Sequence, residues 1–297
     1  MSVALTLIKR NIKLFFKDKG MFFTSLITPG ILLVLYATFL SNVYKNSFLS
    51  GMPNGVFIRE ELIDSLVVGQ LISSLLAVSC VTVAFCSNFL SVQDKANGTV
   101  KDLKISPVKS SVLSLSYYIS SFVSTLVICL CALGLGLIYM AIVGWYLSFG
   151  DVMLLILDVL LLVFFGTALS SVINFFLSTQ GQISAVGSIV STGYGFICGA
   201  YMPISSFGDG LQTAVAFLPG TYGTALFRNH ATRGVFEEMA SDGMPSEAIK
   251  GFSDSIDCNI YFFDTAVPQG VMYAIVSASV LVLVVAYILM NKFKKKV

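Results

Sequence analysis

The sequence predicts an all-α membrane protein with six transmembrane helices, an amphipathic helix before the first span and short helices before the last. Its composition is the first reason: 56% of the residues are hydrophobic and 11% are charged, against about 45–50% and 25% in a soluble domain. The second reason is a series of long apolar stretches, and the third is the placement of lysine and arginine around them. We therefore expect much of the surface to face lipid.

Six stretches are long and apolar enough to cross a bilayer, which takes about 20 helical residues. They cover residues 21–43, 67–90, 114–143, 151–177, 182–202 and 269–291 of a single transmembrane domain, 1–297. The third and the fourth exceed the required length, so we expect them to tilt or to extend beyond the bilayer.

The positive charges predict that both termini are cytoplasmic. In that orientation only five of the eighteen Lys and Arg residues lie outside, namely Lys45, Arg59, Arg228, Arg233 and Lys250. The other Lys and Arg residues lie before the first span, after the second span or after the last span. Cytoplasmic segments of membrane proteins typically carry an excess of Lys and Arg. An odd number of spans would move one lysine-rich terminus outside, so the span count and the orientation support each other.

Residues 1–20 combine apolar and basic side chains at helical spacing. Leu5, Ile8, Ile12 and Phe15 recur every three or four residues, and lysines occupy every fourth position from residue 9 to residue 17. This pattern predicts an amphipathic helix in the membrane interface, with its lysines near anionic headgroups. The alternative is a charged flank that only fixes the topology.

The loop 91–107 between the second and third spans carries another amphipathic pattern. Val92, Ala96, Val100 and Leu103 form an apolar stripe, and Pro107 ends the element or starts the next. We expect a short helix on the cytoplasmic side. It is either a docking surface for a cytoplasmic partner or a turn that only contributes positive charge.

Residues 203–268 form the longest segment outside the predicted spans. Their prolines, glycines and apolar patches predict short helices, some re-entering the outer leaflet, followed by an exposed polar portion from about Arg228 to Asp264. His230, the single histidine of the chain, lies in that portion. We expect it to be an ordinary surface residue.

Motifs of catalysis do not occur in the sequence. A single histidine excludes multi-histidine metal sites, and neither G-x-x-x-x-G-K-[ST] nor G-x-S-x-G is present. We expect no catalytic residue, no metal site and no cofactor bound by this chain. Asp158 stands out because it lies about two turns inside the fourth span, where a charge costs about 2.5–3.5 kcal/mol. It contacts either a substrate or proton pathway, or a polar group on a neighbouring helix.

The loop 91–107 resembles the ABC type-2 permease family, the membrane subunits of ATP-driven exporters. The family pattern is an acid, three residues, Gly-Thr, then Leu and Ser/Thr-Pro, which here are Asp94, Gly98-Thr99, Leu103 and Ser106-Pro107. The acid is usually Glu, and Lys101 stands where the family often has a second acid. Residues 199–203 and 217–222 resemble the family's end of the fifth helix and its re-entrant external helices.

The resemblance implies a permease subunit that forms half of the pathway of an ABC exporter and is not itself an enzyme. It implies a coupling helix that docks on a cytoplasmic ATPase, with the contributing residues Asp94, Gly98, Thr99, Val100, Leu103 and Pro107. ATP and Mg²⁺ would bind to that ATPase, and a second permease subunit, identical or different, would complete the pathway. No nucleic acid is expected as a partner.

The spans are rich in Phe, Leu, Val and Ser, which suits an apolar or amphipathic cargo such as a drug, a lipid or a hydrophobic peptide. Contact with membrane lipid suits the same composition. We expect a multi-pass protein of a bacterial plasma membrane. The alternative function is a stand-alone secondary transporter or channel, which requires ionisable residues along a pathway.

Overall fold

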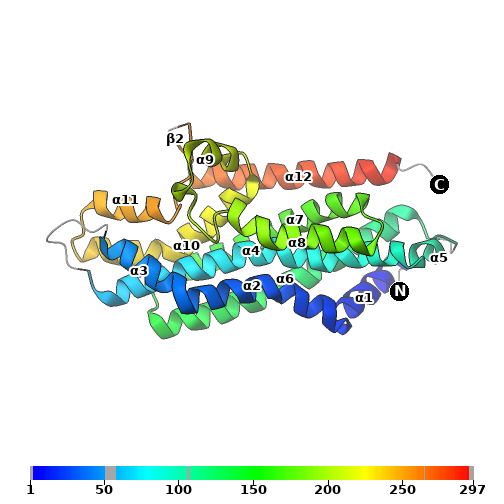
Figure 1. The fold of residues 1–297 in the computed structure, drawn as a ribbon, viewed down its shortest axis with the longest axis horizontal. Coiled ribbons are helices and arrows are strands. Elements are labelled where there is room, and N and C mark those ends of the chain that lie inside the picture. The colour runs from blue at the N-terminus through cyan, green and yellow to red at the C-terminus, as the bar shows by residue number, and fades with distance from the viewer. Residues whose placement is uncertain (1–2, 51–57, 106–107, 264, 294–297) are drawn as a thin grey trace.

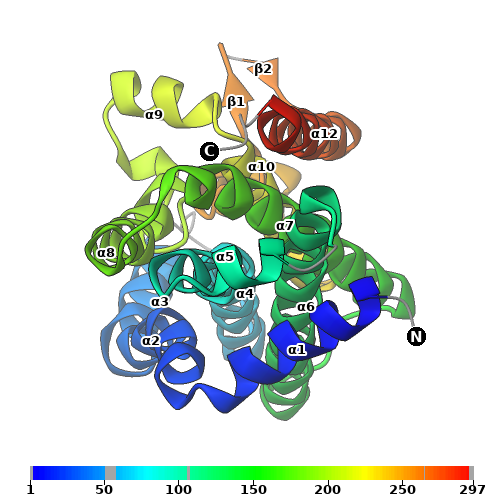
Figure 2. The ribbon, with the colours of Figure 1, turned by 90° about the vertical axis from the view of Figure 1, so that its right-hand side faces the viewer.

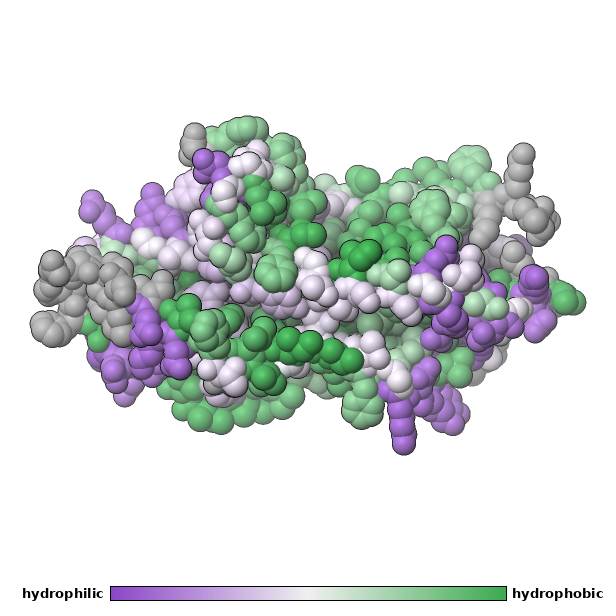
Figure 3. All heavy atoms as spheres, viewed as in Figure 1, coloured by the Kyte–Doolittle hydropathy of each residue, from purple (hydrophilic) through white to green (hydrophobic). Residues whose placement is uncertain are grey.

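The computed structural model describes residues 3–50, 58–105, 108–263 and 265–293, which form an elongated bundle of helices aligned near its long axis (Figure 1). Helices α1 (Val3–Lys17) and α5 (Thr99–Ile105) and the end of α12 (Gln269–Phe293) lie at one end, called here the α5 end. Helices α3 (Ser41–Ser50) and α11 (Ser246–Ser255) lie at the other, the α11 end. Hydrophilic residues gather toward both ends and hydrophobic residues along the middle (Figure 3).

Among the described residues, five helical segments are long and apolar enough to cross a membrane. They are Lys19–Asn46, α4 (Glu60–Ala96), α6 (Ser110–Val143), α7 (Phe149–Phe176) and α12. These segments coincide with five of the six predicted spans, and they confirm an α-helical, multi-pass membrane protein.

The remaining predicted span, 182–202, corresponds to α8 (Gln180–Ile197), which packs beside α4. Its 18 residues give a length of about 27 Å, close to the thickness of the hydrocarbon core. Two glutamines and several serines and glycines make it less apolar than the most apolar stretches of the five other segments. The sixth span stays a prediction.

The first span consists of three consecutive helical pieces. Helix α2 (Lys19–Leu35) begins after Asp18, whose carboxylate accepts a hydrogen bond from the backbone N–H of Met21 at 3.1 Å. The chain continues through Pro29 into a π-helical turn, η1 (Tyr36–Leu40), and then into α3. A π-helical turn rotates the side chains that follow it relative to those before it.

Helix α4 is the centre of the bundle. It packs against α2, α6, α7, α8 and α10, and 94% of its most apolar 18-residue window is buried. Viewed from the α5 end, α2, α6, α7 and α8 surround it (Figure 2). Because every face of α4 contacts protein, its sequence has no strong amphipathic pattern.

Helix α1 packs on α6. Its buried residues are Leu7, Asn11 and Phe15, and of the predicted stripe Phe15 is buried, Ile8 and Ile12 are half-buried and Leu5 is 41% exposed. The side-chain oxygen of Asn11 accepts a hydrogen bond from the neighbouring Arg10 at 2.9 Å. The location of α1 in the membrane interface stays a prediction.

The segment predicted to be external contains η2 (Ile204–Ser206), α9 (Asp209–Ala216), α10 (Pro219–Ser241), α11 and a hairpin. The hairpin pairs β1 (Tyr261–Phe262) antiparallel with β2 (Thr265–Ala266). Helix α10 has 23 residues and packs against α4, α7 and α12. It is therefore part of the bundle.

The predicted exposed portion is wrong at its start, because Arg228, His230 and Thr232 are all buried in α10, whereas most residues from 240 to 247 are exposed. Glycines permit this packing. A side chain at Gly69 of α4 would meet Ala231 and Thr232, and one at Gly234 of α10 would meet the backbone of Tyr146. The close approach of the helices takes the polar residues of α10 out of solvent.

Candidate functional site

The chain reverses direction between α4 and α5, inside the loop predicted to dock a partner. Gly98 has a φ of +81°, which glycine adopts without steric cost. The N–H of Gly98 donates to the Lys95 carbonyl at 3.3 Å, and the N–H of Lys101 donates to the Gly98 carbonyl at 2.8 Å. The predicted single stripe is therefore divided: Val92 and Ala96 end α4, whereas Val100 and Leu103 belong to α5.

Asp94 is buried, and its carboxylate connects three helices. It accepts two hydrogen bonds from the Arg10 guanidinium of α1, at 2.7 and 3.2 Å, and one from the Tyr117 hydroxyl of α6, at 2.5 Å. The guanidinium's hydrogen bonds to Asp94 raise the pKa of Arg10. The carboxylate is thus occupied inside the protein, where it holds α1 and α6 against α4.

Lys95, the next residue, connects α4 to the end of α7. Its ammonium group donates to the backbone carbonyls of Asn174, Phe175 and Leu177 at 2.8, 3.2 and 3.1 Å. These carbonyls lie at the C-terminal end of a helix, where a cation is favoured by the helix dipole and by unsatisfied acceptors. Two consecutive residues of α4 therefore hold α1, α6 and α7 together.

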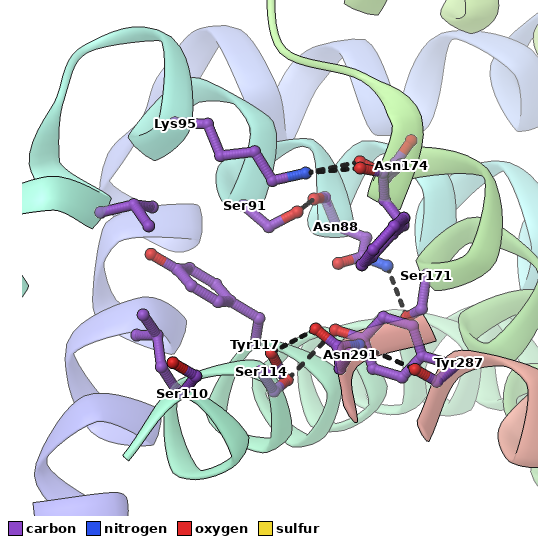
Figure 4. Close-up of a pocket in the computed structure, with 13 residues that line it drawn as sticks. Asn88, Ser91, Lys95, Ser110, Ser114, Tyr117, Ser171, Asn174, Tyr287 and Asn291 are labelled. Atoms are coloured by element: carbon purple, nitrogen blue, oxygen red, sulfur yellow. Dashed lines mark hydrogen bonds between the residues drawn. The ribbon is translucent and has the colours of Figure 1, made fainter. Parts of the chain in front are cut away.

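A polar pocket of about 130 Å³ lies beside these contacts (Figure 4). Helices α4, α6, α7 and α12 contribute most of its walls, and Val100 contributes from α5. Its polar lining residues are Asn88, Ser91, Lys95, Ser110, Ser114, Tyr117, Ser171, Asn174, Tyr287 and Asn291.

Hydrogen bonds across the pocket join the helices that line it. Asn88 donates to Ser171 at 2.8 Å, and Ser114 donates to Asn291 at 2.8 Å. The side-chain amide of Asn174 has no hydrogen-bond partner among the described residues. The pocket is large and polar enough to hold water molecules.

Helix α5 has an inner and an outer surface. Val100 and Leu103 pack against the hydrophobic core, while Lys101 and Asp102 are exposed and Ile105 is 85% exposed. A large apolar side chain next to charged residues at the tip of a protein is typical of a contact surface.

The other predicted docking residues are less informative. Thr99 is half-buried at the first position of α5, after Gly98. Pro107, together with Ser106, lies outside the described residues.

Asp158 forms a second polar cluster, between α7, α10 and α12. Its carboxylate lies 2.6 Å from Nδ1 of His230 and accepts a hydrogen bond from the Tyr273 hydroxyl at 2.5 Å. The expectation that His230 is a surface residue is wrong, because α10 is packed into the bundle and leaves His230 only 3% exposed. Of the two interpretations of Asp158, these contacts favour the structural one.

The sequence signals did not identify Arg10, Lys95 or Tyr117 as site residues. In the sequence, Arg10 and Lys95 are only positive charges that help to fix the topology, and Tyr117 lies in an apolar span. Their roles depend on contacts between segments 84, 79 and 23 residues apart. Asp94 was the available signal for these residues, because a carboxylate that is buried requires hydrogen-bond donors nearby.

Comparison with protein families relates the chain to membrane transport proteins. The family model described as ABC-2 type transporter matches residues 3–230, which is more than half of the chain. That match includes α1, the α4–α5 junction and the first part of α10. No curated protein matches the chain at a significant level.

Proposed function

Because the chain belongs to the ABC-2 type transporter family and is a permease component of an ABC transporter, we propose that it forms half of the pathway of an ATP-driven exporter. A cytoplasmic ATPase subunit and a second permease subunit, identical or different, complete the transporter. ATP and Mg²⁺ bind to the ATPase, and this chain supplies the pathway and the contact through which the two are coupled.

The α4–α5 junction is the observation that supports this proposal. Ile105, Lys101 and Asp102 are available to a partner, whereas Val100 and Leu103 fix α5 to the bundle. Directly before α5, Asp94 and Lys95 hold the ends of three other helices. A force on α5 therefore acts on α1, α6 and α7 together.

Coupling requires that the ATPase bind two arrangements of the permease with different affinities. Moving that equilibrium from 1:99 to 99:1 takes about 5.5 kcal/mol of differential binding. The ion pair and the helix-end contacts at the α5 end are discrete interactions that a second arrangement of the helices would have to break or replace. Water in the polar pocket would let helices shift there without leaving polar groups unpaired.

The cargo we propose is apolar or amphipathic, such as a drug, a lipid or a hydrophobic peptide. The support is the composition of the spans, because their inward-facing polar groups are mainly serine, threonine and asparagine and the buried charges are paired. Such a pathway favours molecules that carry little charge.

The test is reconstitution of the chain with the ATPase encoded beside its gene, in liposomes. Lys101→Glu reverses an exposed charge on α5, and Lys250→Glu makes the same change on α11, at the opposite end. We expect Lys101→Glu to reduce co-purification of the ATPase and its stimulated ATP hydrolysis, and Lys250→Glu to leave both unchanged. Transport that persists without ATP or an ATPase would instead identify a stand-alone transporter or channel.

A further inference from the structure

The polar pocket at the α5 end is accessible from that end of the bundle. Ser110, at the first position of α6, lines it and is exposed, and Tyr287 and Asn291 of α12 are half-buried. Its volume of about 130 Å³ is close to that of a cavity that binds benzene, about 150 Å³. The pocket therefore has room for a small molecule.

The charge in the pocket is already balanced by the protein. The lining contains the ammonium group of Lys95, which donates to three carbonyls at the end of α7. Among the described lining residues there is no acidic side chain. A cation would meet the charge of Lys95, and an anion would find the N–H groups of that ammonium already engaged. The lining therefore favours an uncharged ligand.

Two side-chain amides in the lining have hydrogen-bonding groups that the described residues leave unused. Asn174 lies on α7 one turn after Ser171, so the two share the face of α7 that lines the pocket. Asn174 is 1% exposed, and neither atom of its amide has a partner among the described residues. Asn88 of α4 donates to Ser170 and Ser171 at 3.1 and 2.8 Å, and its side-chain oxygen accepts no described hydrogen bond.

These unused groups require a ligand that both donates and accepts hydrogen bonds. A buried polar group without a partner is costly. An ether offers only acceptors, whereas each hydroxyl group offers a donor and an acceptor. A molecule with several hydroxyl groups can therefore pair with both amides at once. Glycerol is such a molecule, and it has as many non-hydrogen atoms as benzene.

We propose that the polar pocket binds an uncharged polyol about the size of glycerol, whose hydroxyl groups pair with the side-chain amides of Asn88 and Asn174. Lys95 and Tyr117 lie around the same space (Figure 4) and also hold the α4–α5 junction. A bound polyol therefore stabilises this arrangement of α4, α6 and α7. The site does not depend on the transport function proposed above.

Saturation-transfer NMR on the full chain in nanodiscs tests the class of ligand. Glycerol is compared with 1,2-dimethoxyethane, which lacks hydroxyl donors, and with lactate, which carries a negative charge; all have the same number of non-hydrogen atoms. Empty nanodiscs give the background. We expect transfer to glycerol well above this background, with a dissociation constant at least about fivefold lower than for either other probe.

Three results would overturn the proposal. Transfer to glycerol at the background level would mean that the pocket holds water only. Equal affinities for glycerol and 1,2-dimethoxyethane would mean that hydroxyl donors are not recognised. Tighter binding of lactate would mean that the pocket selects an anion.

Asn174→Leu tests the position of the site. This change nearly preserves the size of the side chain and breaks no described side-chain hydrogen bond, because the amide has no partner. Gln70→Leu is the matched control, since Gln70 is also a buried amide without a described partner but lies outside the pocket lining.

We expect Asn174→Leu to weaken glycerol binding about fivefold to tenfold, the effect of one or two lost hydrogen bonds. Gln70→Leu should retain the parent affinity. Parent-like binding by Asn174→Leu would overturn the assignment of this amide, as would an equal loss of affinity in both variants.

Discussion

Asp94→Asn removes the charge that holds α1 against the α5 end. The Asp94 side chain is 8% exposed and that of Arg10 is 31% exposed. Breaking a fully buried ion pair by removing one partner costs about 3–5 kcal/mol. Because water reaches Arg10, we expect about 2–3 kcal/mol here, which raises the fraction of detached α1 by about 30–150-fold.

Hydrogen exchange in lipid nanodiscs measures this change directly, because amides of Val3–Lys17 exchange when α1 detaches. Glu238→Gln is the control: it removes a partner of Arg59 in an exposed ion pair at the opposite end, and it should leave α1 exchange unchanged. The double variant Arg10→Met with Asp94→Leu should restore most of the protection, since no buried charge is then left unpaired. Parent-like exchange in Asp94→Asn would refute the structural role of the pair.

Three other predictions concern separate parts of the protein. Gly98→Ala and Gly243→Ala place alanine at φ values of +81° and +88° with free space around Cβ, so each should lower stability by about 1 kcal/mol. Only Gly98→Ala should also reduce ATPase stimulation, and equal activity of the two variants would contradict the role of the junction. Asp158→Leu leaves the buried His230 without its carboxylate, and the melting temperature in detergent should fall by several degrees; an unchanged value would show that the contact contributes nothing. Burial raises the pKa of Cys258 to about 11, so a water-soluble maleimide at neutral pH should modify it only after denaturation, and rapid labelling of the folded protein would contradict its burial.

The positions of the membrane spans could be predicted from the sequence because the bilayer imposes one local requirement, a long apolar helix. Segment 182–202 is the exception. Its helix α8 is shorter than predicted and contains two glutamines and several serines, and it packs beside the central helix α4. Hydropathy does not separate such a helix from an external segment.

Helix α10 was misinterpreted for a related reason. Its arginine, histidine and threonines are typical of an exposed segment, yet they are buried because their partners lie elsewhere in the chain. Asp158 of α7 is 72 residues from His230, and Asp257 is 29 residues from Arg228. Sequence periodicity indicates which residues share a face of one helix. It does not indicate which polar residue of another helix they contact.

The candidate site was predicted in part. The single apolar stripe did not reveal the turn at Gly98, where the structure has a positive φ between α4 and α5. The family pattern singled out Asp94, but its partners Arg10 and Tyr117 come from two other helices. The buried role of that carboxylate therefore emerges only from the fold.

The most direct test of coupling at α5 is photo-crosslinking in the reconstituted transporter. Benzoylphenylalanine replaces Ile105, which is 85% exposed on α5, or Phe263, which is 72% exposed beside the β1–β2 hairpin. We predict that position 105 forms a crosslink to the ATPase subunit, that its yield changes when ATP is added, and that position 263 forms none. No crosslink from position 105 to the ATPase, or equal yields from both positions, would contradict the account.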